Sequence, residues 1–207
     1  MTRRMNIIIT ITLLGMACVY GQNVTLQTVT ASLAKRQVTT GDFTQIKKIR
    51  NRTLTSTGTF IFSREGIIWD TQKPFPSTIV IGTTAIVQIM PDGKRTVIEA
   101  AGNQMFTGMS SALTGVFAGD ISQIEDNFSV AFNVQGTEWE ARLTPRDSSM
   151  EAVMQSVTVH GTMNSGDAVL TTIVVEEPAG STITYILSNQ KYPGALTDEQ
   201  RAAFVAQ

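Results

Sequence analysis

The stretch that decides the fold reads GTFIFSREGIIWDTQKPFP and spans residues 58–76. Two short apolar segments flank the tight turn Arg64-Glu65-Gly66, and this pattern predicts a β-hairpin. Phe60 and Phe62 are two residues apart, so they share one face of the first strand. Arg64 follows where this aromatic face ends. An apolar strand face with one cation at its rim favours reversible binding of an apolar ligand. It is also typical of an ordinary β-core with a solvated turn.

Alternating strand patterns continue on both sides of this hairpin and predict a sheet of roughly ten strands. Turns such as Pro91-Asp92-Gly93 separate several of them. Consecutive strands joined by short turns favour an antiparallel meander, and a sheet of this size tends to curl. The expected strands cover residues 42–50, 54–63, 67–70, 77–81, 85–90, 95–100, 128–134, 137–143, 152–160, 168–176 and 181–188.

Helical segments are expected before, between and after the strands, which makes the class α+β, mainly antiparallel β. Residues 25–38 have an amphipathic pattern, and residues 197–206 begin with Thr197 as the helix cap. Residues 121–124 continue as a second short central helix. The 106–117 segment is expected to lie across the concave side of the sheet, as a permanent core element or as a movable lid. Its apolar side chains at helical spacing are Phe106, Met109, Leu113, Val116 and Phe117.

Residues 1–21 have the pattern of a secretory signal peptide. Arg3 and Arg4 precede an apolar run over residues 7–19, which is shorter than the roughly 20 residues of a membrane-spanning helix. Cleavage after Gly21 leaves residues 22–207 as one domain without cysteine, exported to an oxidising compartment without disulfides. Lipidation of Cys18 and an uncleaved anchor are the alternatives.

The charge pattern argues against nucleic acid as a partner. The formal net charge is −1, and the basic group formed by Lys47, Lys48, Arg50 and Arg52 is small. We interpret this group as a solvated strand face. An acidic partner or anionic lipid headgroups are its alternative ligands.

Residue types that carry catalysis are scarce, so we expect no enzyme, no cofactor and no metal. The chain has one histidine, His160, and no GxSxG turn that would pair it with a nucleophile. Zinc would need a carboxylate-rich ligand set. Glu138 and Glu140 share a strand face beside Trp139, and a solvated face explains them. No glycine-rich phosphate loop occurs.

Methionine and phenylalanine are ambiguous in the same way. Nine methionines are present, and Met105, Met109 and Met154 fall in apolar segments. Flexible thioethers suit a packed core, but they also suit a surface that must accept several ligand shapes. Core packing and the lining of an adaptable cavity therefore both remain open for these residues.

Several short motifs follow one another in a recognisable order over residues 25–190. They are Phe43-Thr44-Gln45, then Gly58, Phe60, Phe62, Arg64 and Trp69, then Lys73-Pro74 before the strand at 77–81, and finally Trp139 with Leu143-Thr144-Pro145-Arg146. This order resembles the LolA family, periplasmic carriers of lipoproteins in Gram-negative bacteria. The chain departs from the family pattern at Glu65-Gly66, where a proline usually follows the arginine, and at Gly82-Thr83-Thr84, which replaces an aspartate-glycine turn. The 106–117 helix is similar only in kind to the family's lid.

The resemblance implies an incomplete, unclosed β-barrel with a helical lid over an apolar interior that holds the acyl chains of the cargo. Arg64 takes the place of the arginine that latches the lid helix. The residues expected to contact cargo, in the cavity or in the lid, are Phe43, Phe60, Phe62, Trp69, Met105, Phe106, Met109, Leu113 and Phe117.

The resemblance also implies a monomeric periplasmic carrier with an inner-membrane donor and an outer-membrane acceptor. Its partners would be lipoproteins or other acylated lipids, and a glycolipid is an alternative cargo because the chain is divergent. Two other classes compete with the carrier. One is a permanently packed envelope scaffold, and the other is a lipid-modifying enzyme that would depend on His160.

Overall fold

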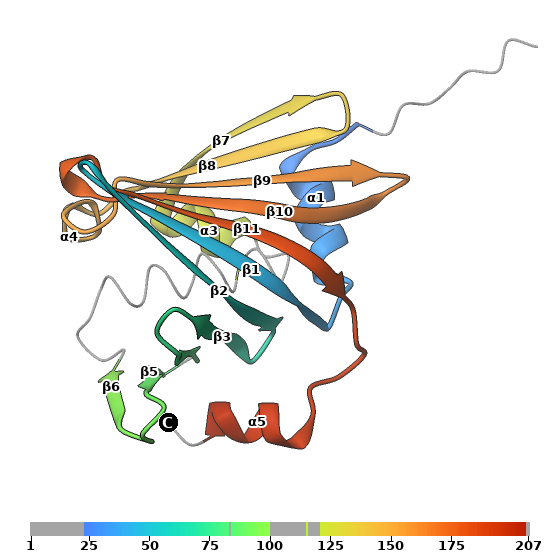
Figure 1. Ribbon diagram of the computed structural model, residues 1–207. Coiled ribbons are helices and arrows are strands. Elements are labelled where there is room, and N and C mark those ends of the chain that lie inside the picture. Colours follow the sequence, from blue (N-terminus) through green and yellow to red (C-terminus); the bar gives the residue numbers. More distant parts are fainter. Residues whose placement is uncertain (1–22, 83, 100–114, 116–120, 206–207) are drawn as a thin grey trace, which may run out of the picture.

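The computed structural model describes residues 23–82, 84–99, 115 and 121–205. Eleven antiparallel strands form one sheet in the order β6-β5-β4-β3-β2-β1-β11-β10-β9-β8-β7. The sheet is strongly curved and does not close (Figure 1). The strands are β1 Val38–Ile49, β2 Arg52–Ser63, β3 Gly66–Lys73, β4 Ser77–Ile81, β5 Ala85–Ile89, β6 Arg95–Glu99, β7 Phe128–Gln135, β8 Glu138–Pro145, β9 Ser156–Asn164, β10 Asp167–Glu176 and β11 Thr182–Lys191.

Helices accompany the sheet at both of its faces. They are α1 Leu26–Ala34, α3 Ile121–Asn127, α4 Ser148–Glu151 and α5 Asp198–Val205, with one 3₁₀ turn at Pro178–Gly180. None of the helices in the described part of the chain is long and apolar enough to cross a membrane. The predicted class, α+β with an unclosed antiparallel barrel, is confirmed. The expected leader and, apart from Gly115, the expected 106–117 helix fall outside the described residues.

Two meanders make up the sheet, and one long-range pairing joins them. Strands β1 to β6 follow one another to one edge, and β11 back to β7 follow one another to the other. The first and last strands of the chain meet in the middle, where Phe43 lies opposite Gly58 on β2 and opposite Leu187 on β11. Gly58 is required there, because an added Cβ would collide with the main-chain oxygen of Asp70.

Several predicted element boundaries are wrong, and two of them have a clear local cause. The helix expected over 25–38 ends at Ala34, because Val38 already pairs with Ser63 as the first residue of β1. The strand expected over 152–160 begins at Ser156, because Asp147 caps the short helix α4 just before it. The Asp147 carboxylate accepts a hydrogen bond from the Ser149 main-chain N–H at 2.8 Å. Local caps therefore override the strand pattern in this segment.

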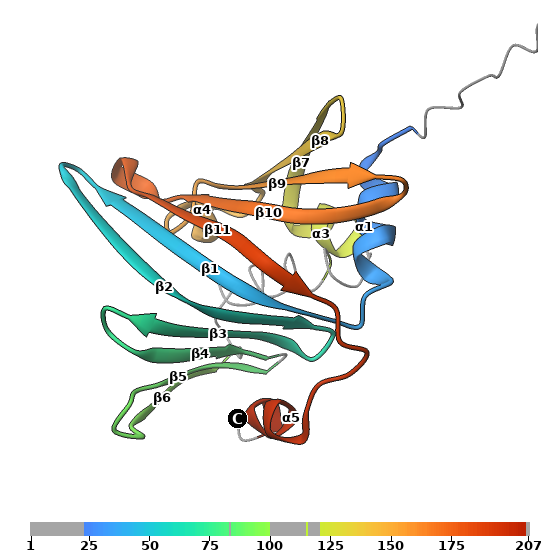
Figure 2. The ribbon, with the colours of Figure 1, turned by 45° about the vertical axis from the view of Figure 1, so that its right-hand side comes forward.

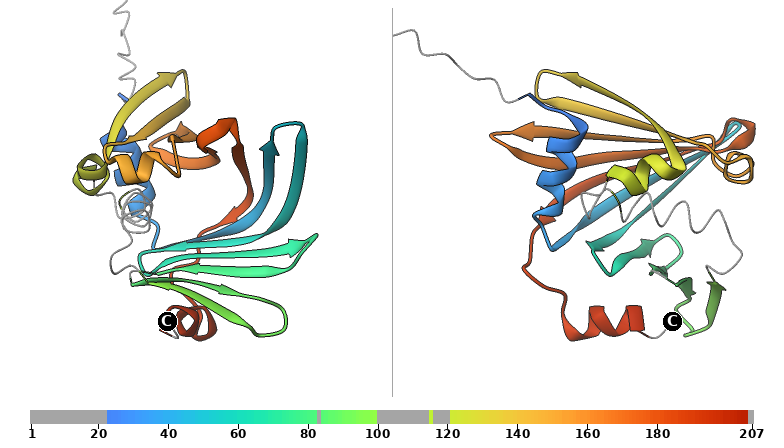
Figure 3. Two further views of the ribbon diagram at one scale, coloured as in Figure 1. Left: turned by 90° about the vertical axis from the view of Figure 1, so that its left-hand side faces the viewer. Right: turned by 180° about the vertical axis from the view of Figure 1, so that it is seen from behind.

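The concave side of the sheet carries α1 and α3 (Figure 3). Helix α1 is fixed to β10 through Ser32, whose hydroxyl donates to the Gly166 main-chain oxygen at 3.0 Å and accepts from the Ala168 N–H at 2.9 Å. Its buried side chains Val29 and Leu33 join the main hydrophobic core. This helix therefore closes one end of the concave space, and the Ser32 hydroxyl both donates and accepts a hydrogen bond at the contact.

The opposite, convex face of β3 to β5 is covered by the C-terminal helix α5 (Figure 3). Ile68, Val80 and Val87 form a small buried cluster against Ala203 and Phe204. Helix α5 begins with a reciprocal cap: the Thr197 hydroxyl accepts from the Gln200 N–H, and the Gln200 side chain accepts from the Thr197 N–H. The predicted cap residue Thr197 is thereby confirmed.

Candidate functional site

The concave face of the sheet encloses a cavity of about 310 Å³. Both meanders contribute to its wall, so the cavity exists only because β1 and β11 pair. Among the described residues, sixteen line the cavity. Thirteen of them have aliphatic, aromatic or thioether side chains, with the indole N–H of Trp69 as their one polar group, and Gln45, Thr71 and Tyr185 are polar. The lining residues are Gln45, Phe62, Ile67, Trp69, Thr71, Ile79, Ile81, Ile86, Phe128, Leu143, Met154, Val157, Val159, Ile173, Val175 and Tyr185.

Strand register explains how residues distant in sequence reach this wall. Ile67 lies opposite Phe62 on β2 and opposite Ile81 on β4, while Trp69 lies opposite Ile79. Because side chains alternate between the two faces of a strand, these paired positions all point to the concave side. The apolar rows of neighbouring strands thus merge into one continuous surface.

A cluster of rings holds the indole of Trp69 in the wall. The ring centroids of Trp69 and Phe43 are 4.7 Å apart, and Tyr185 meets Trp69 edge-on at 4.7 Å and 80°. Phe60 and Phe62 pack beside it, 4.5 Å apart. Such offset and edge-on pairs stabilise the wall here beyond the burial of each ring. Within the described residues, the buried Nε1 of Trp69 has no hydrogen-bond partner.

Tyr185 is a half-buried polar member of this wall. Burial raises the pKa of its phenol to about 12, and the negative charge of Glu177 adds to the rise. The group is therefore neutral over the whole physiological range. A neutral phenol in an apolar wall is compatible with an apolar ligand, whereas a charged group would not be.

The structure separates the predicted cargo residues into three groups. Phe62 and Trp69 line the cavity. Phe43 and Phe60 are buried behind the wall, 2% and 1% exposed, and support it without lining the cavity. The contact of these four residues with cargo stays a prediction. Five predicted residues lie outside the described residues: Met105, Phe106, Met109, Leu113 and Phe117.

Arg64 lies exposed in the β2–β3 turn, at the rim of the concave side. Its guanidinium donates to the main-chain oxygen of Ala34, the last residue of α1, at 3.5 Å. The turn is tightened by Ser63, whose hydroxyl accepts from the Glu65 N–H at 3.2 Å. The described structure thus shows that Arg64 reaches a helix end. The predicted latch to the 106–117 segment stays a prediction, because Gly115 is the one residue of that segment that is described.

The sequence interpretation overlooked half of the cavity wall. Val157, Val159, Ile173 and Val175 come from β9 and β10 and face Phe62 and Trp69 across the cavity. Their signal was present as alternate apolar residues in the second meander. Without knowledge that β1 pairs with β11, this signal did not indicate which face of β9 and β10 would meet the first hairpin.

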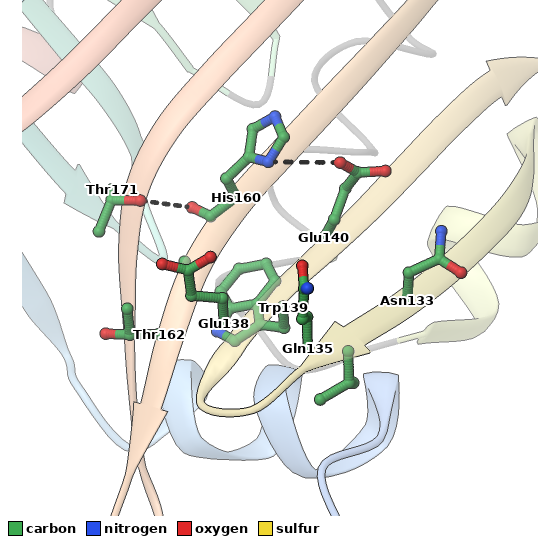
Figure 4. A pocket seen from close by; sticks show the side chains of 10 residues that line it. Asn133, Gln135, Glu138, Trp139, Glu140, His160, Thr162 and Thr171 are labelled. Atoms are coloured by element: carbon green, nitrogen blue, oxygen red, sulfur yellow. Dashed lines mark hydrogen bonds and ion pairs between the residues drawn. The ribbon is translucent and has the colours of Figure 1, made fainter.

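A second hollow, of about 520 Å³, lies near the β7–β8 hairpin and is polar (Figure 4). His160 Nδ1 is 3.5 Å from Glu140 Oε2, and both side chains are more than a third exposed. Thr171 donates its hydroxyl hydrogen to the main-chain oxygen of His160, not to its imidazole. No group of three or more His, Cys, Asp or Glu side chains within the described residues could hold a metal ion.

The geometry defines the class of protein, which is an open antiparallel barrel whose concave face encloses an apolar cavity. The family model described as outer membrane lipoprotein carrier protein LolA matches residues 34–201. The chain therefore belongs to the LolA family, as the resemblance predicted. No curated protein sequence matches it.

One solved structure with a TM-score above 0.5 has a similar fold. A DUF1329 family protein from Desulfovibrio piger is similar at a TM-score of 0.52 and 13% identity, covering 86% of this chain and 96% of that one. A LolA superfamily protein from Nitrosomonas europaea has a TM-score of 0.46 and 11% identity, over 84% and 94% of the two chains. A putative outer membrane lipoprotein-sorting protein domain from Vibrio parahaemolyticus has a TM-score of 0.46 and 9% identity, over 86% and 97%.

Proposed function

We propose that this protein is a periplasmic carrier that holds the acyl chains of lipoproteins in its apolar cavity. It shuttles them from an inner-membrane donor to an outer-membrane acceptor, as a monomer and without catalysing a reaction. The observation that carries the proposal is the 310 Å³ cavity, whose wall is almost entirely apolar. Membership in the LolA family supports the same function.

The free energy of acyl burial suits a carrier. Burying one methylene contributes about 0.8 kcal/mol, so a chain of about 14 methylenes yields roughly 11 kcal/mol, which approaches nanomolar affinity. Several chains buried completely would be held too tightly to be released. A carrier therefore needs a term that opposes binding, and delivery then requires only an acceptor with higher affinity.

Arg64 supplies this opposing term in the proposal. Its guanidinium can donate up to five hydrogen bonds, and breaking each bond to a charged group costs about 1.5–3 kcal/mol. Its guanidinium donates a hydrogen bond to the main-chain oxygen of Ala34 at the end of α1, and this contact supports a role in holding a helix at the rim of the cavity. Cargo would break such bonds on entry, and their re-formation would assist release.

A transfer assay tests the function with three variants. Phe62→Glu places a charge in the cavity wall, and we expect it to abolish binding of a fluorescent fatty-acyl probe and transfer of a lipoprotein from donor to acceptor membranes. Ile186→Glu is the matched control, because Ile186 lies on the convex face, 44% exposed. It should behave like the unchanged protein. Arg64→Leu should bind the probe but retain the cargo, so that transfer stops.

Unchanged probe binding by Phe62→Glu would contradict the proposal and favour a packed scaffold. Normal transfer by Arg64→Leu would remove Arg64 from the mechanism. Mass spectrometry of lipids extracted from the native protein then identifies the cargo. Lipoprotein acyl chains are the expected finding, and a glycolipid would redirect the carrier to a different export route.

A further inference from the structure

Three hairpin turns lie at one end of the strands, along the edge of the curved sheet that is formed by turns and not by β6 or β7. They join β1 to β2, β3 to β4 and β5 to β6, and because consecutive strands are antiparallel, alternate turns fall on the same edge. Figure 2 shows their tips one below the other along the left side of the molecule. We call this edge, formed by residues 48–54, 73–77 and 89–95, the hairpin rim.

The hairpin rim exposes large apolar side chains in all three turns. Phe75 is 82% exposed, Leu54 57%, Met90 39% and Ile49 36%. A single exposed apolar residue needs no explanation, and we take the four in these three turns as the apolar part of an interaction surface. Described turns on the opposite edge are polar in comparison, with Arg64-Glu65 between β2 and β3 and 164–166 between β9 and β10.

Charge on the hairpin rim has one dominant sign. The residues 48–54, 73–77 and 89–95 contain six basic side chains and a single acid, Asp92, although the whole chain has a net charge of −1. Asp92 is engaged locally, since its carboxylate accepts from the Lys94 N–H at 2.9 Å. The six basic residues, all exposed, are Lys48, Arg50, Arg52, Lys73, Lys94 and Arg95. Beyond the rim, Lys47 is paired with Glu177 at 3.1 Å.

We propose that the hairpin rim docks on the surface of an anionic phospholipid bilayer. Exposed apolar tips surrounded by lysine and arginine are the combination that binds the interface of such membranes, with cations at the headgroups and apolar groups below them. Phe75 is the leading contact. Pro74 and Pro76 restrict the backbone on both sides of it, so little conformational freedom is lost when its ring enters the interface.

The rim is continuous with the cavity. Along the concave face of β1, Gln45 lines the cavity, and Lys47 and Ile49 follow it at alternate positions toward the tip. Leu54 lies directly opposite Lys47 on β2. An acyl chain that moves between a membrane at the rim and the cavity would therefore stay in contact with the protein along the whole path. This docking goes beyond the proposed function, because vesicle binding requires no cargo.

Vesicle co-sedimentation tests the docking with protein purified from the periplasm. We expect binding to vesicles of phosphatidylglycerol and phosphatidylethanolamine that weakens as salt rises, and little binding to phosphatidylcholine alone. Phe75→Ser should weaken binding about tenfold. The double variant Lys48→Glu/Arg52→Glu should weaken it about thirtyfold or more.

Matched controls lie on the opposite edge. Val134→Ser replaces an aliphatic side chain that is 42% exposed, and Lys35→Glu/Lys191→Glu reverses two exposed cations. Both should bind anionic vesicles like the unchanged protein. Equal losses in the rim and control variants would overturn the proposal, because binding would then follow total charge.

Absence of vesicle binding at low salt would also overturn the proposal and leave the rim as a surface for an acidic protein. The same samples are tested with the fatty-acyl probe in solution. Rim variants should bind this probe normally, since none of the changed residues lines the cavity. Vesicle binding without probe binding in the unchanged protein would refute the carrier and leave the docking surface intact.

Discussion

Strands β3 to β5 bury apolar side chains on both of their faces, but the two faces are completed differently. On the convex face, Val80 and Val87 are 0% exposed and pack directly against α5. On the concave face, Ile79 and Ile81 of the same strand β4 line a cavity of about 310 Å³. Neighbouring residues of one short strand thus belong to a solid core and to the wall of a cavity. Apolar character alone therefore does not distinguish a core from a binding surface.

We expect the stability of the two faces to differ most when a carboxylate is placed on each of them. Val80→Asp buries a carboxylate with no room for water and should lower the free energy of unfolding by about 4 kcal/mol or more. Ile81→Asp, one residue later, faces the cavity and should cost about 1–2 kcal/mol, because the carboxylate can remain hydrated there. Urea unfolding of both variants measures the difference. Equal losses would mean that the concave face is as solid as the convex one.

An intermediate effect is expected when a valine is enlarged on each face. Val87→Phe overpacks the cluster under α5 and should cost about 1–3 kcal/mol. Val175→Phe points into the cavity, and its effect on stability should stay within about 1 kcal/mol. The added ring should nevertheless weaken fatty-acyl probe binding about tenfold by occupying the space for the ligand. A Val175→Phe variant that binds the probe normally would place the ligand elsewhere.

The smallest effect concerns the phenol of Tyr185. Its pKa is raised to about 12 by burial and by Glu177, so the folded state favours the neutral form. The resulting stabilisation is complete below the ordinary tyrosine pKa of about 10 and is lost as the pH rises from there toward 12. Absorbance titration of the protein and of Tyr185→Phe measures this shift. Titration at the ordinary pKa would show that water reaches the cavity wall.

The local sequence pattern was sufficient to predict most strands of the sheet. The alternation of Phe60 and Phe62 and the turn at Gly66 predicted the central hairpin, and β4 was predicted with its exact limits, Ser77–Ile81. The pairing of β1 with β11 was beyond such reasoning, because it joins Phe43 to Leu187 across almost the whole chain. The helix α4 was missed because four residues are too few to show a helical period.

The candidate site was predictable only in part for the same reason. Trp69 and Phe62 were identified from one hairpin whose face could be read locally. Whether a side chain lines the cavity or lies behind it depends on the curvature of the sheet, as Phe43 and Phe60 show. The partner wall of β9 and β10 depends on the long-range pairing. Sequence therefore located the apolar face but not the shape of the space above it.

Two tryptophans allow the most direct test of the central claim, that the concave face holds an acyl chain. Trp69 lines the cavity, whereas Trp139 is packed against Gly161 near the β7–β8 hairpin. A fatty acid brominated along its chain quenches an indole only on contact. With Trp139→Phe, which leaves Trp69 as the emitter, we expect saturable quenching, and with Trp69→Phe we expect almost none. Quenching of Trp139 alone, or of neither indole, would contradict the account.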